Sequence, residues 1–317
     1  MSAETPSLAI VICTFKRPEL LRAALRSVAA QALPPAHGAI NVYVVDNSDE
    51  SDAQNIVAEE AANSPLPMRW LAAHPANISV ARNAGVRAGD EDFVAFIDDD
   101  QTLEPSWLTA VFEAFANPQA DAWLGCVDGM FEAPQQTTAA VRRLFSRQLE
   151  EPSGLELFAF GPQKLATISL ATNNAIFRRA TALTDALIFD PRFGRGGGED
   201  YDLFCRLQRR GKRFFWLKEA RVREFVPAAR CQRAYLRRRF YAGGQAFAVA
   251  IARGGKSPQA LRWLIRAKAL VQAVLLIAQA PAYLFKDNAL RADYAFRWAG
   301  VLGKMSFGAI YPLYQEK

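Results

Sequence analysis

In Phe93-Val94-Ala95-Phe96-Ile97-Asp98-Asp99-Asp100, five apolar residues are followed directly by three carboxylates. β-Branched and aromatic residues in so short a run predict a buried strand that ends at Ile97. Three like charges at a strand end repel one another and lose hydration when they are partly covered. A divalent cation would remove that cost, and oxygen ligands suit Mg²⁺ or Mn²⁺. The alternative is a solvated acidic turn, which is the commoner meaning of an acidic triplet on its own.

Three earlier apolar runs alternate with segments of helical spacing. The runs are Leu8–Cys13, Ile40–Val45 and Met68–Ala72, and the helical segments begin near Pro18, Asp52 and Ser79, with another after Pro105. This alternation indicates an α/β fold with a mostly parallel central sheet and helices on both faces. Ligands of such sheets bind beyond the carboxyl ends of the strands. Thr14, Asp46 and the Asp98–Asp100 triplet are all expected at that edge.

The pattern is less regular after residue 130. The expected elements are a connecting helix within Pro134–Glu151, a strand within Ile168–Phe177, a glycine-rich loop at Gly194–Gly198, a helix that Gly211 stops, and a strand at Phe214–Leu217. The loop leads into Glu199-Asp200-Tyr201-Asp202, so it brings a second acidic cluster to the start of a helix.

Composition excludes several classes of site. The 317 residues are 51% hydrophobic and 22% charged, which is typical of a globular chain with one large domain or a domain and an appendage. Four widely spaced cysteines form no C-x-x-C pair, which argues against a zinc site or a disulfide framework and fits a reducing compartment. Since His37 and His74 are the only histidines, carboxylates are expected to do any acid–base work. Met1–Pro6 does not resemble a signal peptide, so we expect a cytoplasmic protein.

Charge is distributed unevenly along the chain. Residues 1–203 carry 15 Lys and Arg against 27 Asp and Glu, whereas residues 204–317 carry 23 against 5. The basic second part predicts anionic partners such as phosphates or lipid head groups. We expect a catalytic domain over residues 1–245 and a helical region over residues 246–317.

The segment Leu261–Phe285 combines apolar residues with Arg262, Arg266 and Lys268. It is too short and too interrupted for a membrane span, which needs about 20 apolar residues. A basic helix of this kind fits a membrane surface. The alternative is a helix that packs on the main domain or on a second copy of the chain, as in a homo-oligomer.

Five short motifs, taken in order, resemble family 2 glycosyltransferases with the GT-A fold. They are Val11–Pro18, Val44–Ser48, Ile78–Gly85, Phe96–Asp100 and Gly197–Leu203. Asp98-Asp99-Asp100-Gln101 and Arg221–Pro227 are most similar to the succinoglycan-type exopolysaccharide glucosyltransferases of that family. The processive members carry a Gln-x-x-Arg-Trp motif, which Gln232-Arg233-Ala234-Tyr235 does not match, so a processive synthase is disfavoured.

The resemblance implies roles for residues in the acidic first part. Nucleotide-sugar binding is implied for Thr14, Phe15, Arg17, Asp46, Asn47, Arg82, Asp98, Asp99 and Asn174. Several of them have simpler structural interpretations. Asp46 could form an Asx turn with Ser48, Arg82 a surface ion pair, and Asn174 a buried structural amide. In the basic second part, the arginines of Arg237-Arg238-Arg239, Arg237 among them, are expected to bind the diphosphate of the nucleotide sugar or an acceptor pyrophosphate, because arginine forks suit phosphate; a solvated basic helix face is the alternative.

The resemblance also implies a metal and a catalytic base. Asp100 and Asp98 match the aspartates of the family's metal-binding motif, and Glu224 stands near the place where many relatives have a histidine ligand. Asp200 is the expected base, with Glu199 as the neighbour that could take its role; capping of the helix is the alternative for this cluster. Asp99 is the member of the triplet whose loss is expected to matter least.

The implied activity is an inverting, Mn²⁺- or Mg²⁺-dependent transfer of a hexose from a UDP-sugar to a glycan acceptor, soluble or linked to polyprenyl diphosphate. The cytoplasmic face of the cell membrane is the expected location. A sugar nucleotidyltransferase would have a glycine-rich loop after the first strand, which Thr14-Phe15-Lys16-Arg17 lacks. A non-catalytic basic module that binds membrane or nucleic acid leaves the acidic clusters unexplained.

Overall fold

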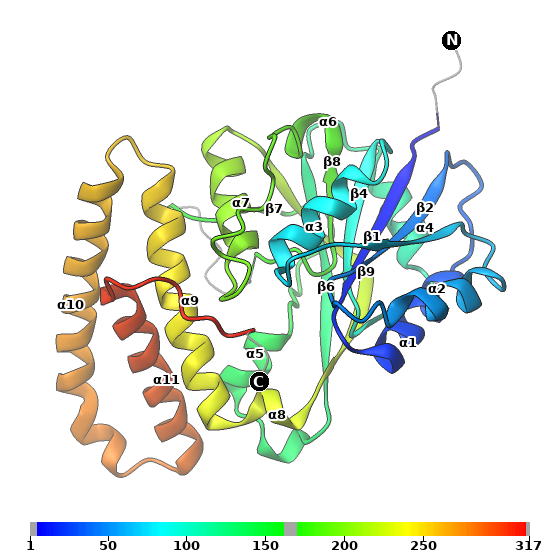
Figure 1. The fold of residues 1–317 in the computed structure, drawn as a ribbon. Helices are drawn as coiled ribbons and strands as arrows, with labels where there is room; N and C mark the ends of the chain where they lie inside the picture. The colour runs from blue at the N-terminus through cyan, green and yellow to red at the C-terminus, as the bar shows by residue number, and fades with distance from the viewer. Residues whose placement is uncertain (1–4, 162–169, 315–317) are drawn as a thin grey trace.

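The computed structural model describes residues 5–161 and 170–314. Strands and helices alternate through the first third of the chain, as expected (Figure 1). They are β1 (Leu8–Thr14), α1 (Pro18–Ala29), β2 (Ile40–Asp46), α2 (Ala53–Ala61), β3 (Met68–Ala72), α3 (Ile78–Arg87), β4 (Phe93–Asp98), β5 (Gln101–Leu103) and α4 (Trp107–Ala114). All four strands predicted over residues 8–97 are present.

The remaining elements form the other half of the sheet and a group of long helices. They are β6 (Ala122–Phe131), the 3₁₀ turn η1 (Pro134–Gln136), α5 (Ala139–Phe145), β7 (Glu156–Leu157), β8 (Ala175–Arg178), α6 (Arg179–Ala182), α7 (Glu199–Arg209), β9 (Phe214–Val226), α8 (Ala228–Cys231), α9 (Arg233–Arg253), α10 (Pro258–Leu284) and α11 (Asn288–Met305).

The strands form one sheet in the order β3-β2-β1-β4-β8-β6-β9-β5, with β7 added on β9. Pairing is parallel from β3 to β4, whereas β8 is antiparallel to both of its neighbours. The sheet is therefore parallel in its first half and mixed in its second. In β1, Thr14 lies opposite Asp46 and Cys13 opposite Asp98, so the polar ends of three strands meet at one edge.

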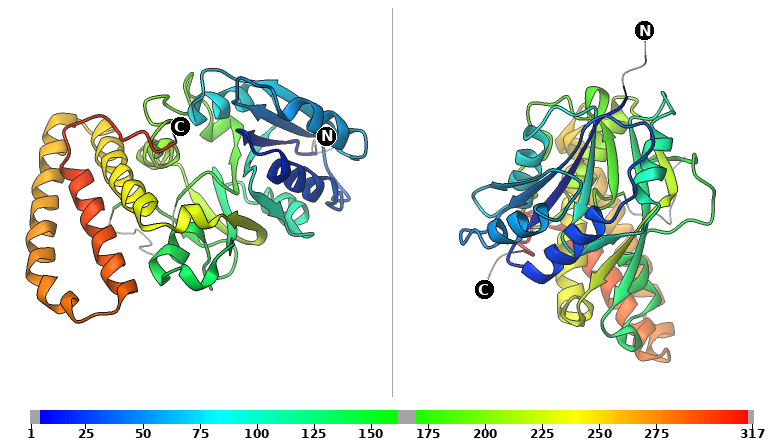
Figure 2. Two further views of the ribbon diagram at one scale, coloured as in Figure 1. Left: turned by 60° about the horizontal axis from the view of Figure 1, so that its bottom comes forward. Right: turned by 90° about the vertical axis from the view of Figure 1, so that its right-hand side faces the viewer.

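Helices cover both faces of the sheet because side chains of the strands alternate between two cores. Ile10 and Ile12 of β1 face the core that α1, α2 and α4 cover, whereas Ala9 and Val11 face the core beneath α3 and α7. Figure 2 shows the sheet between these layers, with α9, α10 and α11 beside it.

Three sequence expectations differ from the structure in extent. Pro134–Glu151 contains the short η1 and α5 and no single connecting helix, because Arg147 forms an antiparallel bridge with Val127 of β6. The strand expected at Phe214–Leu217 continues as β9 to Val226; its second half alternates buried and exposed residues, which is the pattern of a one-sided strand. The strand expected within Ile168–Phe177 is β8, which starts at Ala175; residues 168 and 169 lie outside the described residues.

Two of the C-terminal helices, α9 and α11, pack closely through glycines. A Cβ on Gly244 of α9 would lie 2.2 Å from the carbonyl oxygen of Gly300 of α11, so the two helices approach at a distance that only glycine allows. The domain boundary expected at residue 245 falls inside α9. No helix within the described ranges, 5–161 and 170–314, combines the length and apolarity needed to cross a bilayer.

Candidate active site

A cavity of about 1370 Å³ opens at the carboxyl ends of β1 and β4 and extends to the C-terminal helices. Its charged and amide-bearing lining includes Arg17, Asn47, Arg82, Asp98, Asp99, Asp100, Arg147, Asn173, Glu199, Asp200, Glu224, Arg230, Arg239 and Arg297. Thr14 and Phe15 also line it. Most of the residues that the sequence singled out therefore meet in one place.

Asp98, Asp100 and Glu224 form a cluster in which one carboxylate oxygen of each residue lies within 4.8 Å of those of the other two. The first two follow directly from the end of β4. Glu224 reaches them because β5 pairs antiparallel with β9, which puts Gln101 opposite Glu224. This is the set of metal ligands that the resemblance implied.

The cluster fits a hard divalent cation on the chemistry of its donors. One oxygen of Glu224, Oε2, accepts hydrogen bonds from Gln101 Nε2 at 3.1 Å and Asn173 Nδ2 at 3.0 Å, so the carboxylate is held in place from two sides. Burial raises the pKa of Glu224 to about 7, and the nearby Asp100 adds to that rise. Buried carboxylates that repel one another are the groups that Mg²⁺ or Mn²⁺ would neutralise.

Three arginines that are far apart in the sequence approach the cluster. Asp100 Oδ2 accepts from Arg17 Nη1 at 3.1 Å and from Arg230 Nη1 at 3.0 Å. Arg82 Nη2 lies 3.6 Å from Asp98 Oδ1. Guanidinium groups at these distances suit a diphosphate as well as a carboxylate, since both offer paired anionic oxygens.

Asp99 shares Arg17 with Asp100 but is not one of the three clustered carboxylates among the described residues. Its Oδ2 accepts from the Thr14 hydroxyl at 2.8 Å and its Oδ1 from Arg17 at 2.9 Å. Burial raises the pKa of Asp99 to about 6, although Arg17 opposes the rise. Asp99 therefore fixes Thr14 and Arg17, while its two neighbours in the triplet join the metal-binding cluster.

The glycine-rich loop places Glu199 and Asp200 at the start of α7. Gly197 and Gly198 have φ values of +84° and +100°, which side chains with a Cβ rarely adopt, so the loop needs glycine there. Glu199 is buried and forms an ion pair with Arg82. Burial raises its pKa to about 7, against the effect of Arg82.

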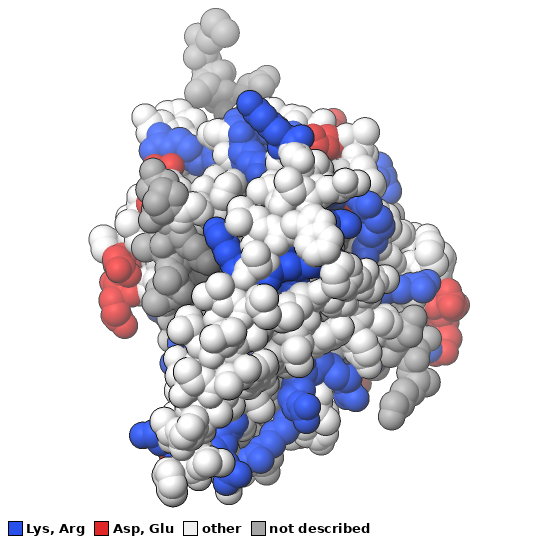
Figure 3. Space-filling model, turned by 90° about the vertical axis from the view of Figure 1, so that its left-hand side faces the viewer, with Lys and Arg blue, Asp and Glu red and all other residues white. Residues whose placement is uncertain are grey.

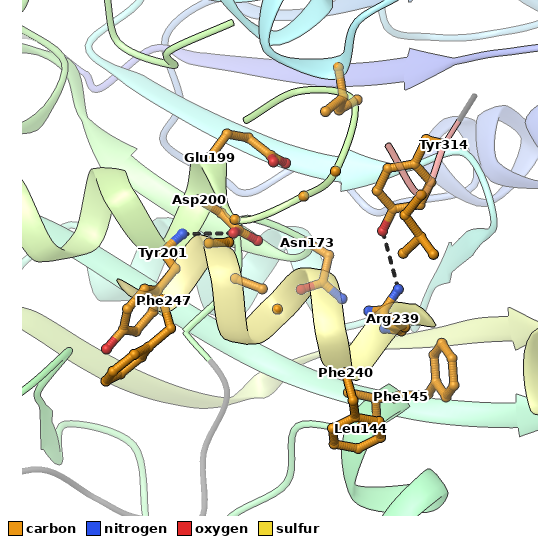
Figure 4. Close-up of a pocket in the computed structure, with 18 of the residues that line it drawn as sticks. Leu144, Phe145, Asn173, Glu199, Asp200, Tyr201, Arg239, Phe240, Phe247 and Tyr314 are labelled. Atoms are coloured by element: carbon orange, nitrogen blue, oxygen red, sulfur yellow. Dashed lines mark hydrogen bonds between the residues drawn. The ribbon is translucent and has the colours of Figure 1, made fainter. Parts of the chain in front are cut away.

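Both carboxylates line the cavity, and Asp200 is the more exposed of the two. It is half-buried, and one of its oxygens accepts from the backbone N of Tyr201 at 2.7 Å. In Figure 4 its carboxylate and the amide of Asn173 point into the same space in front of α9. Because Glu199 is paired with Arg82, Asp200 has the better position to accept a proton from a bound molecule.

Asp46 is engaged within its own turn. Its Oδ1 accepts from the backbone N and the hydroxyl of Ser48, at 2.9 and 2.8 Å, and its Oδ2 from the backbone N of Ala53 at 3.1 Å. The Asx turn that the sequence offered as an alternative is thus present. Its neighbour Asn47 lines the cavity and donates to the carbonyl oxygen of Pro75 at 3.2 Å.

Two further residues expected at the nucleotide sugar are, like Asp46, not among the residues that line the cavity in the described part of the chain. Asn174 is fully buried; its amide accepts from Trp107 Nε1 and donates to the carbonyls of Cys126 and Ala220, each at 2.8 Å, so it has a structural role. Arg237 is exposed and is not among the cavity residues described. Arg239 lines the cavity instead, because side chains two positions apart on a helix point about 200° away from each other.

Sequence patterns did not single out Arg147 or Tyr314, and they indicated Arg239 only as one of three consecutive arginines, Arg237-Arg238-Arg239. Arg147 is buried and donates to carbonyls of the loop before β8, including that of Asn174 at 2.9 Å, which fixes the loop that carries Asn173. Burial lowers its pKa to about 10. The hydroxyl of Tyr314, on the segment after α11, accepts from Arg239 at 3.2 Å (Figure 4).

Comparisons with known proteins agree with this geometry. The family model described as glycosyl transferase family 2 matches residues 9–181, more than half of the chain. The chain is 33% identical to the succinoglycan biosynthesis protein ExoM of Rhizobium meliloti over 77% of this chain and 75% of that protein. It is 26% identical to a glucosyl-dolichyl phosphate glucuronosyltransferase of Haloferax volcanii over 68% of each.

Solved structures confirm the expected GT-A fold. A mannosyltransferase of Pyrobaculum calidifontis, in complex with GDP-Man and Mn²⁺, superposes with a TM-score of 0.61 at 19% identity and covers 95% of this chain and 87% of that one. S. aureus TarS 1–349 in complex with UDP gives a TM-score of 0.57 at 16% identity, with 94% and 89% covered.

Proposed function

This chain belongs to glycosyltransferase family 2, and from that premise we propose that it transfers a hexose from a UDP-sugar to a hydroxyl of a glycan acceptor, with inversion at the anomeric carbon, in the synthesis of an extracellular or cell-surface polysaccharide. One observation carries the proposal. Asp98, Asp100 and Glu224 converge within 4.8 Å in the cavity that Asp200 also lines. Such a transfer needs a carboxylate cluster for the metal ion that would bind the diphosphate, and a separate carboxylate that accepts the proton of the acceptor.

The residues around the cluster fit a nucleoside diphosphate. Thr14, Arg17 and Asn47 line the cavity at the ends of β1 and β2, where the nucleoside would lie. Arg17 and Arg230 reach the cluster from two sides and would bind the diphosphate oxygens. Asp98, Asp100 and Glu224 would hold Mn²⁺ or Mg²⁺, and the ion would supply charge neutralisation for the departing diphosphate.

Asp200 performs the proton transfer in this proposal. It takes the proton of the acceptor hydroxyl while that oxygen forms a bond to the anomeric carbon. The bond between this carbon and the diphosphate oxygen breaks, and the nucleoside diphosphate leaves with the electron pair. Glu199 forms an ion pair with Arg82, and this pair holds the guanidinium of Arg82 near Asp98.

Donor binding is tested by thermal unfolding of the full chain with UDP-, GDP- and dTDP-sugars, with and without Mn²⁺. We expect a UDP-sugar and Mn²⁺ together to stabilise the protein by about 2.7 kcal/mol at a donor concentration a hundredfold above its Kd. Either component alone should do less, because donor and ion bind together at the acidic cluster. Absence of metal-dependent stabilisation by every nucleotide sugar would contradict the proposal.

We also propose that the protein works at the cytoplasmic face of the cell membrane, on an acceptor linked to polyprenyl diphosphate. Trp263, Leu270, Val274 and Ile277 follow one another on one side of α10 and are each more than half exposed. Figure 3, which looks onto the side where α10 lies, shows Lys and Arg gathered around an uncharged band. Apolar side chains between cations suit a surface of anionic lipid.

The membrane proposal predicts the effect of a double variant. Leu270→Gln with Ile277→Gln should weaken binding to vesicles of phosphatidylglycerol and phosphatidylcholine by about tenfold or more, since two exposed apolar side chains are lost from the docking face. Co-sedimentation measures it, and Leu187→Gln, an exposed leucine 47% accessible on the catalytic part, is the matched control. Unchanged vesicle binding, or a dimer that the double variant dissociates, would contradict the membrane proposal.

A further inference from the structure

The cavity continues past the acidic cluster into a groove between α9, α10 and α11. Phe240, Gly243 and Phe247 of α9 line it, as do Leu275 and Leu276 of α10 and Val301 of α11. We call this part the helical groove. A Cβ built on Gly243 meets no atom within 4 Å, so open space lies directly beside the middle of α9.

The helical groove combines apolar walls with cations. Leu276 and Val301 are buried, Leu275 is exposed, and Arg297 and Lys304 of α11 stand on the same lining. No Asp or Glu of α9, α10 or α11 is among the cavity residues in the described part of the chain. Such a surface repels neither an apolar chain nor an anion, and it attracts a molecule that carries both.

The groove leads to the proposed base. A Cβ on Gly198, next to Glu199, would lie 2.5 Å from Cβ of Ala246, so the start of α7 touches α9 one turn beyond Gly243. Tyr201, which follows Asp200, stacks on Phe247 with ring centroids 5.7 Å apart. A molecule seated along α9 therefore ends beside Asp200.

We propose that the helical groove binds the phosphate-bearing end of a polyprenyl-linked acceptor. Arg297 and Lys304 contact the phosphate, Leu275, Leu276 and Val301 contact the first isoprene units, and the glycan extends toward Asp200. This inference rests on the proposed function and deepens it, because it assigns the acceptor to residues that neither the nucleotide nor the metal cluster uses. The walls are fixed, since the contact of Gly244 with Gly300 holds α9 against α11.

Gly243 allows a test that leaves the fold intact. Gly243→Leu places its side chain in open space and replaces glycine in a helix, which favours helix formation by up to about 1 kcal/mol. Affinity for geranylgeranyl phosphate in detergent micelles, measured by microscale thermophoresis, should fall by about tenfold or more in this variant. Gly243→Ala is the matched control and should stay within about threefold of the unaltered protein.

One further variant and two further ligands identify which part of the molecule the groove binds. Arg297→Gln should weaken geranylgeranyl phosphate binding by about fivefold or more, because a cation near the phosphate is lost. Geranylgeraniol should bind more weakly than its phosphate, and inorganic pyrophosphate should compete only at much higher concentration. Equal affinity for the alcohol, competition by pyrophosphate at equal concentration, unaltered binding by Gly243→Leu, or no binding at all would each overturn the inference.

UDP and Mn²⁺ separate this inference from the proposed function. Thermal stabilisation by UDP with Mn²⁺ should be the same in Gly243→Leu, Arg297→Gln and the unaltered protein, because the acidic cluster is untouched. Retained UDP stabilisation together with failed lipid binding would refute only the helical groove. If UDP with Mn²⁺ did not stabilise even the unaltered protein, the proposed function itself would be refuted.

Discussion

Asp200→Asn is expected to lower kcat by about a hundredfold to ten-thousandfold, because an amide cannot accept the proton of the acceptor hydroxyl. The amide oxygen can still accept from the backbone N of Tyr201, so the start of α7 should keep its geometry. Initial rates of hexose transfer at saturating donor and acceptor measure the effect. Stabilisation by UDP and Mn²⁺ should be unchanged, which would separate catalysis from donor binding.

Glu199→Gln is the matched control for the base. This change removes the buried partner of Arg82, and breaking a buried pair typically destabilises a protein by about 3–5 kcal/mol. We therefore expect Glu199→Gln to lower the melting temperature while kcat, measured below that temperature, stays within about tenfold. The opposite result, a rate retained in Asp200→Asn and abolished in Glu199→Gln, would assign the role of base to Glu199.

Asp100→Asn is expected to remove most of the metal-dependent activity. Asp100 is buried in the cluster with Asp98 and Glu224 and would help to hold the metal ion. Such an ion typically stabilises the charge that develops on a leaving diphosphate by several kcal/mol. A loss of about a hundredfold or more in kcat/KM follows from that magnitude. Titration with Mn²⁺ at fixed UDP-sugar measures both the rate and the apparent metal affinity.

Asp99→Asn is the neighbouring control for the metal. Asp99 binds Thr14 and Arg17 and is absent from the cluster of three carboxylates among the described residues. We expect this variant to raise the KM for the nucleotide sugar while the Mn²⁺ concentration giving half-maximal rate stays unchanged. Undiminished turnover in Asp100→Asn, or a metal dependence altered only in Asp99→Asn, would refute the assignment within the triplet.

Local patterns were sufficient for the first half of the fold. The β-branched runs at Leu8–Cys13 and Phe93–Ile97 are strands because burial on both faces selects such residues, and this selection acts over a few neighbours. The polar residues at their carboxyl ends meet because parallel strands align those ends at one edge. Strand β9 was harder to predict, since in its second half buried residues alternate with exposed, partly charged ones, and the charges resemble those of a loop.

Tertiary structure decided which of the implied residues can act together. Asp46 and Asp200 are both acidic residues beside turns, yet Asp46 is bound by its own backbone turn and Asp200 faces the cavity. Asn174 is held by Trp107 and two buried carbonyls. The partners of Asn174 lie 46 to 67 residues away, so the sequence around this amide does not reveal them, whereas the Asx turn of Asp46 with Ser48 is local.

The sequence by itself determined the α/β fold, the acidic triplet at a strand end and the second acidic cluster after a glycine-rich loop, because each depends on residues a few positions apart. Only the tertiary structure brought Glu224 to Asp98 and Asp100, through the pairing of β5 with a strand 123 residues further along. It also turned Arg239 into the cavity and Arg237 away from it, and it opened the groove beside Gly243. Strand register and helix rotation fix these positions, and both are set by packing across the whole chain.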